Sequence, residues 1–119
     1  MPEISAEISL FTRLNALKEE TDFEFVLELI DIYLNETPVQ IKAISAALAN
    51  SDAHALAQVA HKLKGSSMNI GAVRMGELCL KLEEMGRSGT PVPKGISSAE
   101  LESEFGQIAK LMSKFRQKG

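Results

Sequence analysis

The chain has 119 residues, of which 45% are hydrophobic and 24% are charged, and its formal net charge is -3. A chain of this length buries one cooperative core, so we expect a single domain over residues 1–119. The slight acidic excess is the opposite of what binding to a nucleic-acid backbone requires, and we expect no nucleic-acid partner.

The sequence also lacks the features of a membrane-inserted or disulfide-bonded protein. No apolar run approaches the ~20 residues that cross a bilayer, and an N-terminus with Glu3 and Glu7 does not resemble a cationic signal peptide. We therefore expect a cytoplasmic location without membrane insertion. Cys79 is the single cysteine, which excludes an internal disulfide and predicts a reduced, buried thiol.

The first half of the chain predicts two helices. Residues 4–17 form a short amphipathic segment that could lie across a bundle. Asp22 can cap a second helix whose apolar stripe resumes after Pro38. An interior proline removes a backbone donor, whereas Thr37-Pro38 could instead begin a new helix. Both arrangements are open, and we favour one long helix with a kink.

Two further helices follow closely. The third is expected from near Asp52 to about Asn69, with Gly71 suited to ending it. The fourth is expected from Ala72 to about Gly86. Such a short connection favours two antiparallel neighbours.

The clear loop of the chain lies between Gly86 and Gly95, where glycine and proline interrupt any regular pattern. After it, Ser97 with Glu100 predicts a capping box at the start of the last helix. Apolar residues recur at spacings of three and four, without the alternation of a strand. The expected fold class is therefore all-α: an up-down-up-down four-helix bundle, with its core at about residues 22–117, and a short extra N-terminal helix.

The third helix separates a core stripe from an unusual polar face. At about 100° per residue, His61 falls roughly 140° from the centre of the stripe, Gly65 near 180° and Met68 near 120°. We expect these three to face solvent. Lys64, near 80°, is expected at the boundary. The predicted core stripe consists of Leu56, Val59, Ala60, Leu63 and Ile70.

The combination of His61, Lys64 and Gly65 is more informative than any of its members. An exposed histidine is usually an ordinary surface residue. A glycine at an exposed mid-helix position, however, costs about 1 kcal/mol relative to alanine. Here it could admit another molecule close to the imidazole, or it could serve close packing against a neighbouring helix. Lys64 can place its ammonium near an anion on the ring. The trio predicts an accessible histidine that carries an anion.

The wider pattern carries a family resemblance. Residues 60–72 read Ala-His-Lys-Leu-Lys-Gly-Ser-Ser-Met-Asn-Ile-Gly-Ala, and Leu82-Glu83 follows on the next expected helix. This pattern resembles the histidine phosphotransfer (HPt) family of two-component phosphorelays, whose signature is His-x-Leu-Lys-Gly-Ser, a later glycine and a Leu-Glu pair. The resemblance is specific over residues 60–83, and it implies the bundle expected above.

The resemblance also implies roles for individual residues. His61 matches the phosphoacceptor, modified on Nε2, and Lys64 matches the lysine that offsets the phosphoryl charge. Gly65 matches the glycine that admits the partner. Glu83 matches a residue that accepts a hydrogen bond from Nδ1 and so fixes the tautomer. On its own helix, Glu83 falls about 120° from the apolar stripe, which predicts a boundary position. The alternative for this glutamate is a surface ion pair with Arg87, one turn further on.

Two more residues are expected to contact the partner. Ser66 matches a polar position of the motif, and Met68 offers an adaptable apolar side chain beside the histidine.

No metal site is expected in the chain. His54 is the one other histidine, and it lies about 10 Å from His61 along the helix, too far to share an ion.

By this resemblance, the expected function is to relay a phosphoryl group between His61 and the aspartate of a response-regulator receiver domain, including one carried by a hybrid sensor histidine kinase. The sequence has no glycine-rich phosphate loop and no aspartate cluster for magnesium. We therefore expect a monomeric phosphocarrier without kinase activity and without a cofactor, with Mg²⁺ held by the receiver domain. A docking module without chemistry is the rival hypothesis. A helical enzyme or metal protein lacks suitable ligand spacing.

Overall fold

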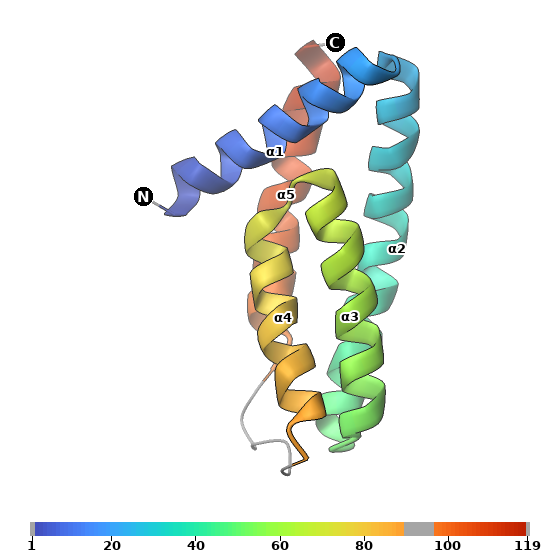
Figure 1. Ribbon diagram of the computed structural model, residues 1–119, viewed down its shortest axis with the longest axis vertical. Coiled ribbons are helices and arrows are strands. Elements are labelled where there is room, and N and C mark those ends of the chain that lie inside the picture. Colours follow the sequence, from blue (N-terminus) through green and yellow to red (C-terminus); the bar gives the residue numbers. More distant parts are fainter. Residues whose placement is uncertain (1, 90–96, 119) are drawn as a thin grey trace.

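Helices form almost the whole architecture. The computed structural model describes residues 2–89 and 97–118, and the side chains of residues 8–89 and 97–117. Within these residues the chain forms five helices and no strand (Figure 1). This confirms the all-α prediction. The helices are α1 (Pro2–Glu20), α2 (Phe23–Ala49), α3 (Ala53–Ile70), α4 (Val73–Arg87) and α5 (Ala99–Lys118).

Helices α2 to α5 form the expected bundle. They run in alternating directions, and α2 contacts α3, α3 contacts α4, α4 contacts α5 and α5 contacts α2 (Figure 1). Helix α1 lies across one end and contacts the other four helices, as expected for the N-terminal segment. It is longer than the predicted residues 4–17. Most of the predicted loop between Gly86 and Gly95 lies outside the described residues. None of the described helices contains a stretch long and apolar enough to cross a membrane.

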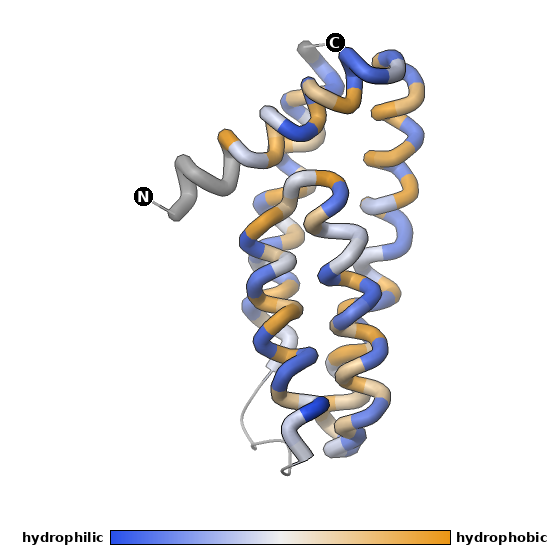
Figure 2. The backbone as a smooth tube through the Cα atoms, viewed as in Figure 1, coloured by the Kyte–Doolittle hydropathy of each residue, from blue (hydrophilic) through white to orange (hydrophobic). Residues whose placement is uncertain are grey.

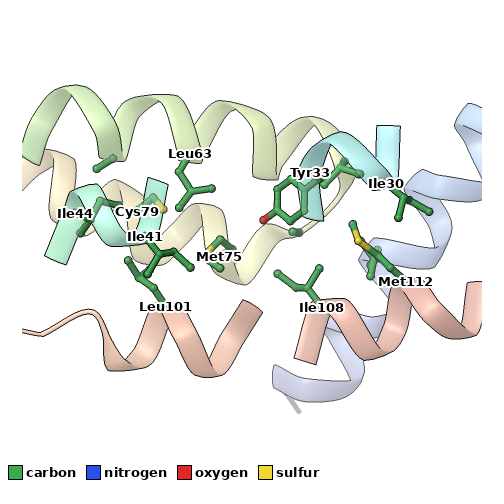
Figure 3. Packing of buried hydrophobic residues seen from close by; sticks show 14 of the residues in the cluster. Ile30, Tyr33, Ile41, Ile44, Leu63, Met75, Cys79, Leu101, Ile108 and Met112 are labelled. Atoms are coloured by element: carbon green, nitrogen blue, oxygen red, sulfur yellow. The ribbon is translucent and has the colours of Figure 1, made fainter. Parts of the chain in front are cut away.

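Apolar stripes from all five helices meet in one core. Hydrophobic positions recur along α2 to α5 with hydrophilic positions between them (Figure 2). Leu63, Met75 and Ile108 point into the space between α3, α4 and α5 (Figure 3). Cys79 is fully buried in the same core, as predicted, and this burial raises the pKa of its thiol to about 12. Burial of this apolar surface supplies the main driving force for folding.

A side-chain cap and a glycine define the ends of the helix that carries His61. The Asp52 carboxylate accepts a hydrogen bond from the Ala55 N–H at 3.1 Å and caps the start of α3. At the other end, Gly71 adopts a left-handed conformation with a φ of 91°. Glycine takes this conformation without the penalty that a Cβ atom imposes. A Cβ at Gly71 would also lie 2.6 Å from Cβ of Arg13, so α1 packs directly against the α3–α4 turn.

Helix α2 continues through Pro38. The helix runs from Phe23 to Ala49 without interruption, which confirms one element rather than two. Tyr33 and Ile41 are buried on either side of the proline, whereas Pro38 itself is exposed. Burying the stripe on both sides offsets the loss of one backbone hydrogen bond. The kink stays a prediction.

The capping box predicted for the last helix is wrong, because that helix begins one residue later than predicted. Helix α5 begins at Ala99, and the Ser98 carbonyl accepts a helical hydrogen bond from the Glu102 N–H at 3.0 Å. The Ser97 hydroxyl accepts from the Ala99 N–H at 3.3 Å, and not from the expected Glu100. Ser98 and Leu101 are both buried, so packing sets the start of α5.

Candidate functional site

The α3–α4 turn brings His61 and Glu83 together. His61 lies ten residues before Gly71, and Glu83 lies eleven residues after Ala72. In two antiparallel helices joined by a tight turn, residues equally far from the turn lie side by side, because both helices rise at the same rate. The His61 Nδ1 atom is 2.9 Å from Oε2 of Glu83. This is the pair that the family resemblance implied.

The Glu83 carboxylate determines which nitrogen of His61 carries the proton. An ionised carboxylate can only accept, so Nδ1 must donate to it. In the neutral ring Nε2 is then left with its lone pair, and it makes no hydrogen bond within the described residues. The His61 side chain is 59% exposed. The neutral form of the ring therefore presents an unprotonated nitrogen at an accessible surface.

Glu83 is more buried and more heavily paired than the boundary position predicted from its helix. Its side chain is 8% exposed. Oε1 lies 2.7 Å from Nζ of Lys64, while Oε2 lies 3.0 Å from Nη2 of Arg87. The Lys64 ammonium lowers the pKa of Glu83 below its ordinary value of 4.5, and the His61 hydrogen bond acts in the same direction against the cost of burial. The carboxylate is thus held in its ionised form.

The ion pair with Arg87 is not an alternative to the contact with His61. Both partners meet the same oxygen of Glu83, Oε2, in one arrangement. Lys64 occupies the predicted boundary position, with its side chain 25% exposed. Its ammonium is held by Glu83 on the neighbouring helix. The role that the resemblance implies for Lys64 at a phosphoryl group stays a prediction.

The space beside Gly65 is open. Gly65 is exposed, and a Cβ atom placed there would have no neighbour within 4 Å. Close packing against another helix therefore does not explain this glycine. The remaining explanation is that the position must be free for an approaching molecule. Gly65 lies one turn beyond His61 on the same face of α3.

The Met68 side chain is exposed and packs beside Gly76 of α4. This side chain stays 45% exposed, as the predicted docking position requires. A Cβ atom at Gly76 would lie 2.6 Å from the Met68 sulfur, so Gly76 makes room for this side chain. Sequence reasoning missed Gly76. The one indication in the sequence is that Gly76 is a glycine in the interior of an expected helix. Such a glycine lowers helix stability unless another group packs closely against it.

Ser66 and Ser67 divide polar and structural roles between them. Ser66 is exposed, and its hydroxyl donates to the Leu63 carbonyl at 3.2 Å. Ser67 is buried, and its hydroxyl is 2.8 Å from the Tyr33 hydroxyl. Burial raises the pKa of Tyr33 to about 12. The hydrogen bond between Tyr33 and Ser67 links α2 to α3 behind the site, and sequence reasoning missed it.

Among the described residues, no cluster of His, Cys, Asp and Glu side chains is placed to hold a metal ion.

A family model described as "Hpt domain" matches residues 28–117. The chain belongs to the Hpt domain family. Among solved structures, it is similar to histidine-containing phosphotransfer protein B (HptB) of Pseudomonas aeruginosa PAO1. That comparison gives a TM-score of 0.79 and 31% identity and covers 91% of this chain and 93% of that one.

Further relatives support the same family. Histidine-containing phosphotransfer proteins 5 and 2 of Arabidopsis thaliana are each 31% identical over 77 residues, or 62% of this chain. The chain spans about half the length of these relatives, since the match covers 49% of each. The HPT domain of a hybrid histidine kinase from Shewanella has a TM-score of 0.61 at 22% identity, covering 95% of this chain and 90% of that one. At this identity the likeness concerns the fold.

The charge of Glu83 should make stability depend on pH. Because the folded protein lowers the pKa of Glu83 below 4.5, its ionised form stabilises the fold above that pH. The contribution is lost as the pH falls through the folded pKa. Glu83→Gln should therefore lower the melting temperature near neutral pH, and this effect should shrink progressively as the pH falls below 4.5. Thermal unfolding of both proteins across this range measures the difference.

Glu104 also makes stability depend on pH, but it does not affect this comparison. Burial raises its pKa, against the influence of Arg74, so its contribution changes with pH in the opposite direction: stability falls as the pH rises through the folded pKa. It is present in both proteins and cancels in the difference. A Glu83→Gln effect of equal size at both ends of the pH range would show that its charge does not stabilise the fold.

Proposed function

We propose that this chain is a phosphocarrier whose His61 exchanges a phosphoryl group with the aspartate of a receiver domain. One observation carries this proposal: the ionised Glu83 holds the Nδ1 proton and leaves Nε2 of an exposed ring free to react. Membership of the Hpt domain family supports it, as do the names of the relatives. The proposed setting is the cytoplasm, with the chain acting as a monomer.

The transfer needs no proton to move at Nε2. The Nε2 lone pair forms the bond to phosphorus while the bond between phosphorus and the aspartyl oxygen breaks, and the electron pair of that bond stays on the aspartate carboxylate. The imidazole ring then carries positive charge, which Glu83 stabilises through the Nδ1–H hydrogen bond. In the reverse direction the nitrogen–phosphorus bond breaks, and its electron pair returns to Nε2. The step is therefore reversible on a single residue.

The partner is proposed to supply the rest of the chemistry. The receiver domain, including one carried by a hybrid sensor histidine kinase, would bring the aspartate and Mg²⁺. This chain would contribute the nucleophile, Lys64 near the phosphoryl oxygens, and a docking surface around Gly65, Ser66 and Met68. We propose no cofactor on the chain itself and no kinase activity of its own.

A docking module without chemistry is the second candidate. It would also use an exposed surface on α3. However, it does not require an ionised glutamate that fixes the tautomer of His61, nor a donor on Nδ1. The pairing of His61 with Glu83 therefore favours the phosphocarrier.

The direct test is chemical. The purified chain should react with phosphoramidate and acquire one phosphate that is labile in acid and stable in alkali, the behaviour of phosphohistidine. Mass spectrometry should place it on His61. The labelled chain should then pass the phosphate to at least one receiver domain of the same organism when Mg²⁺ is present. Absence of acid-labile phosphate, or its presence on another residue, would refute the proposal.

A further inference from the structure

Arg87 shares the carboxylate that positions the histidine. Its Nη2 atom lies 3.0 Å from Oε2 of Glu83, the oxygen that also accepts the Nδ1 proton of His61. Lys64 holds the other oxygen, Oε1, at 2.7 Å. One largely buried carboxylate thus has two cations beside it, on different oxygens. The function proposed above uses only one of these cations at the phosphoryl group.

The position of Lys64 in the unphosphorylated site conflicts with its proposed role. The carboxylate lies on the Nδ1 side of the ring, whereas a phosphoryl group would be attached to Nε2, which points away from it. An ammonium paired with Oε1 of Glu83 at 2.7 Å would therefore weaken or give up that contact when it pairs closely with the phosphoryl oxygens. Within the described residues Oε1 has no aligned hydrogen bond that would replace this contact.

Departure of Lys64 would be costly without a second cation. The Glu83 side chain is 8% exposed, and an ionised carboxylate that loses its partner in such a place is strongly disfavoured. Arg87 already contacts the carboxylate and can offset this penalty. It lies one turn after Glu83 on the same helix, so its contact does not depend on α3. Its guanidinium carries five N–H donors and can serve both carboxylate oxygens, while its side chain stays 62% exposed to water.

We propose that Arg87 is a positioning residue that compensates Glu83 and thereby frees Lys64 to move to the phosphoryl group on His61. Before transfer, both cations neutralise the carboxylate. After transfer, Arg87 and the Nδ1–H of His61 remain on Glu83, and Lys64 pairs with the phosphoryl oxygens. This inference rests on the proposed phosphocarrier function and adds an exchange of counter-ions to it.

A double-mutant cycle tests the exchange. The measured quantity is the equilibrium constant for phosphoryl exchange between the full chain and one phosphorylated receiver domain. In the wild-type background, Lys64→Met should shift this constant toward the unphosphorylated chain by about fivefold, the size of a partly exposed ion pair. In the Arg87→Met background, Lys64 stays on Glu83, so adding Lys64→Met should change the constant by less than about twofold.

Two control variants separate positioning from a general structural effect. Arg87→Lys keeps the charge and should restore most of the sensitivity to Lys64→Met. Arg74→Met removes a different arginine of α4, which pairs with Glu104 at 3.2 Å, and its effect should add to that of Lys64→Met. Circular dichroism should show the same helix content in all variants, because Arg74 and Arg87 are both exposed.

The ammonium of Lys64 gives an independent readout. Its ¹⁵Nζ resonance should move when phosphoramidate labels the wild-type chain, and it should move much less in Arg87→Met. Full additivity of Arg87→Met and Lys64→Met, or an unchanged ¹⁵Nζ response in Arg87→Met, would overturn the exchange. Failure of phosphoramidate to label the wild-type chain would instead overturn the phosphocarrier function.

Discussion

His61→Gln is expected to abolish acid-labile phosphorylation completely while leaving the helix content unchanged. A glutamine amide can still donate a hydrogen bond to Glu83, but its nitrogen has no lone pair available to attack phosphorus. The side chain of His61 is mostly exposed, so the free energy of unfolding should change by only about 0.5 kcal/mol. Phosphoramidate labelling followed by acid treatment measures the first effect, and chemical denaturation measures the second.

His54→Gln is the matched control for this prediction. His54 is also exposed on α3, near the start of that helix, and no described carboxylate pairs with it. Its replacement should leave labelling and transfer at the wild-type level. Labelling of His61→Gln comparable to the wild type would show that another residue is the phosphoacceptor.

The helix boundaries around the site were predictable because local chemistry sets them. Asp22 and Asp52 accept hydrogen bonds from backbone N–H groups three residues later, and Gly71 takes the left-handed conformation that ends α3. These devices act within a few residues and leave clear signals in the sequence. Helical periodicity alone was then enough to place His61 and Gly65 on the exposed face.

Features that depend on packing between helices were not predictable to the same degree. The wheel placed Glu83 at the edge of its helix, but its burial depends on how closely α3 and α4 approach and in which register. That approach also brings Lys64 of α3 to the carboxylate that Arg87 contacts from its own helix, and spacing within one helix could not indicate the Lys64 contact. The family resemblance supplied the pairing of His61 with Glu83.

The start of α5 was also not predictable from local sequence alone. Ser97 and Ser98 offer two neighbouring capping positions, and local preferences scarcely distinguish them. Burial of Ser98 and Leu101 against the bundle selects the later one. The proline in α2 is the converse case, since burial of Tyr33 and Ile41 on either side keeps the helix continuous where local chemistry left two outcomes open.

Gly65→Gln should abolish phosphoryl exchange with the receiver domain and leave the fold intact. A Cβ atom at this position has no neighbour within 4 Å, so a larger side chain meets no obstacle inside the chain. It would instead fill the space beside His61 that a receiver domain must enter. Gly65→Ala should be the milder change: it should raise the free energy of unfolding by up to ~1 kcal/mol through helix propensity, with a modest loss of exchange. Stability and exchange should therefore move in opposite directions.

A small phosphodonor separates access from chemistry. Phosphoramidate does not dock a protein surface, so it should still label His61 in Gly65→Gln at a rate close to that of the wild type. Loss of labelling with both donors would indicate that the glutamine disturbs His61 itself. If Gly65→Gln exchanges phosphoryl groups with its receiver at the wild-type rate, the open space beside Gly65 does not serve the partner's approach, and the cost of an exposed mid-helix glycine needs another cause.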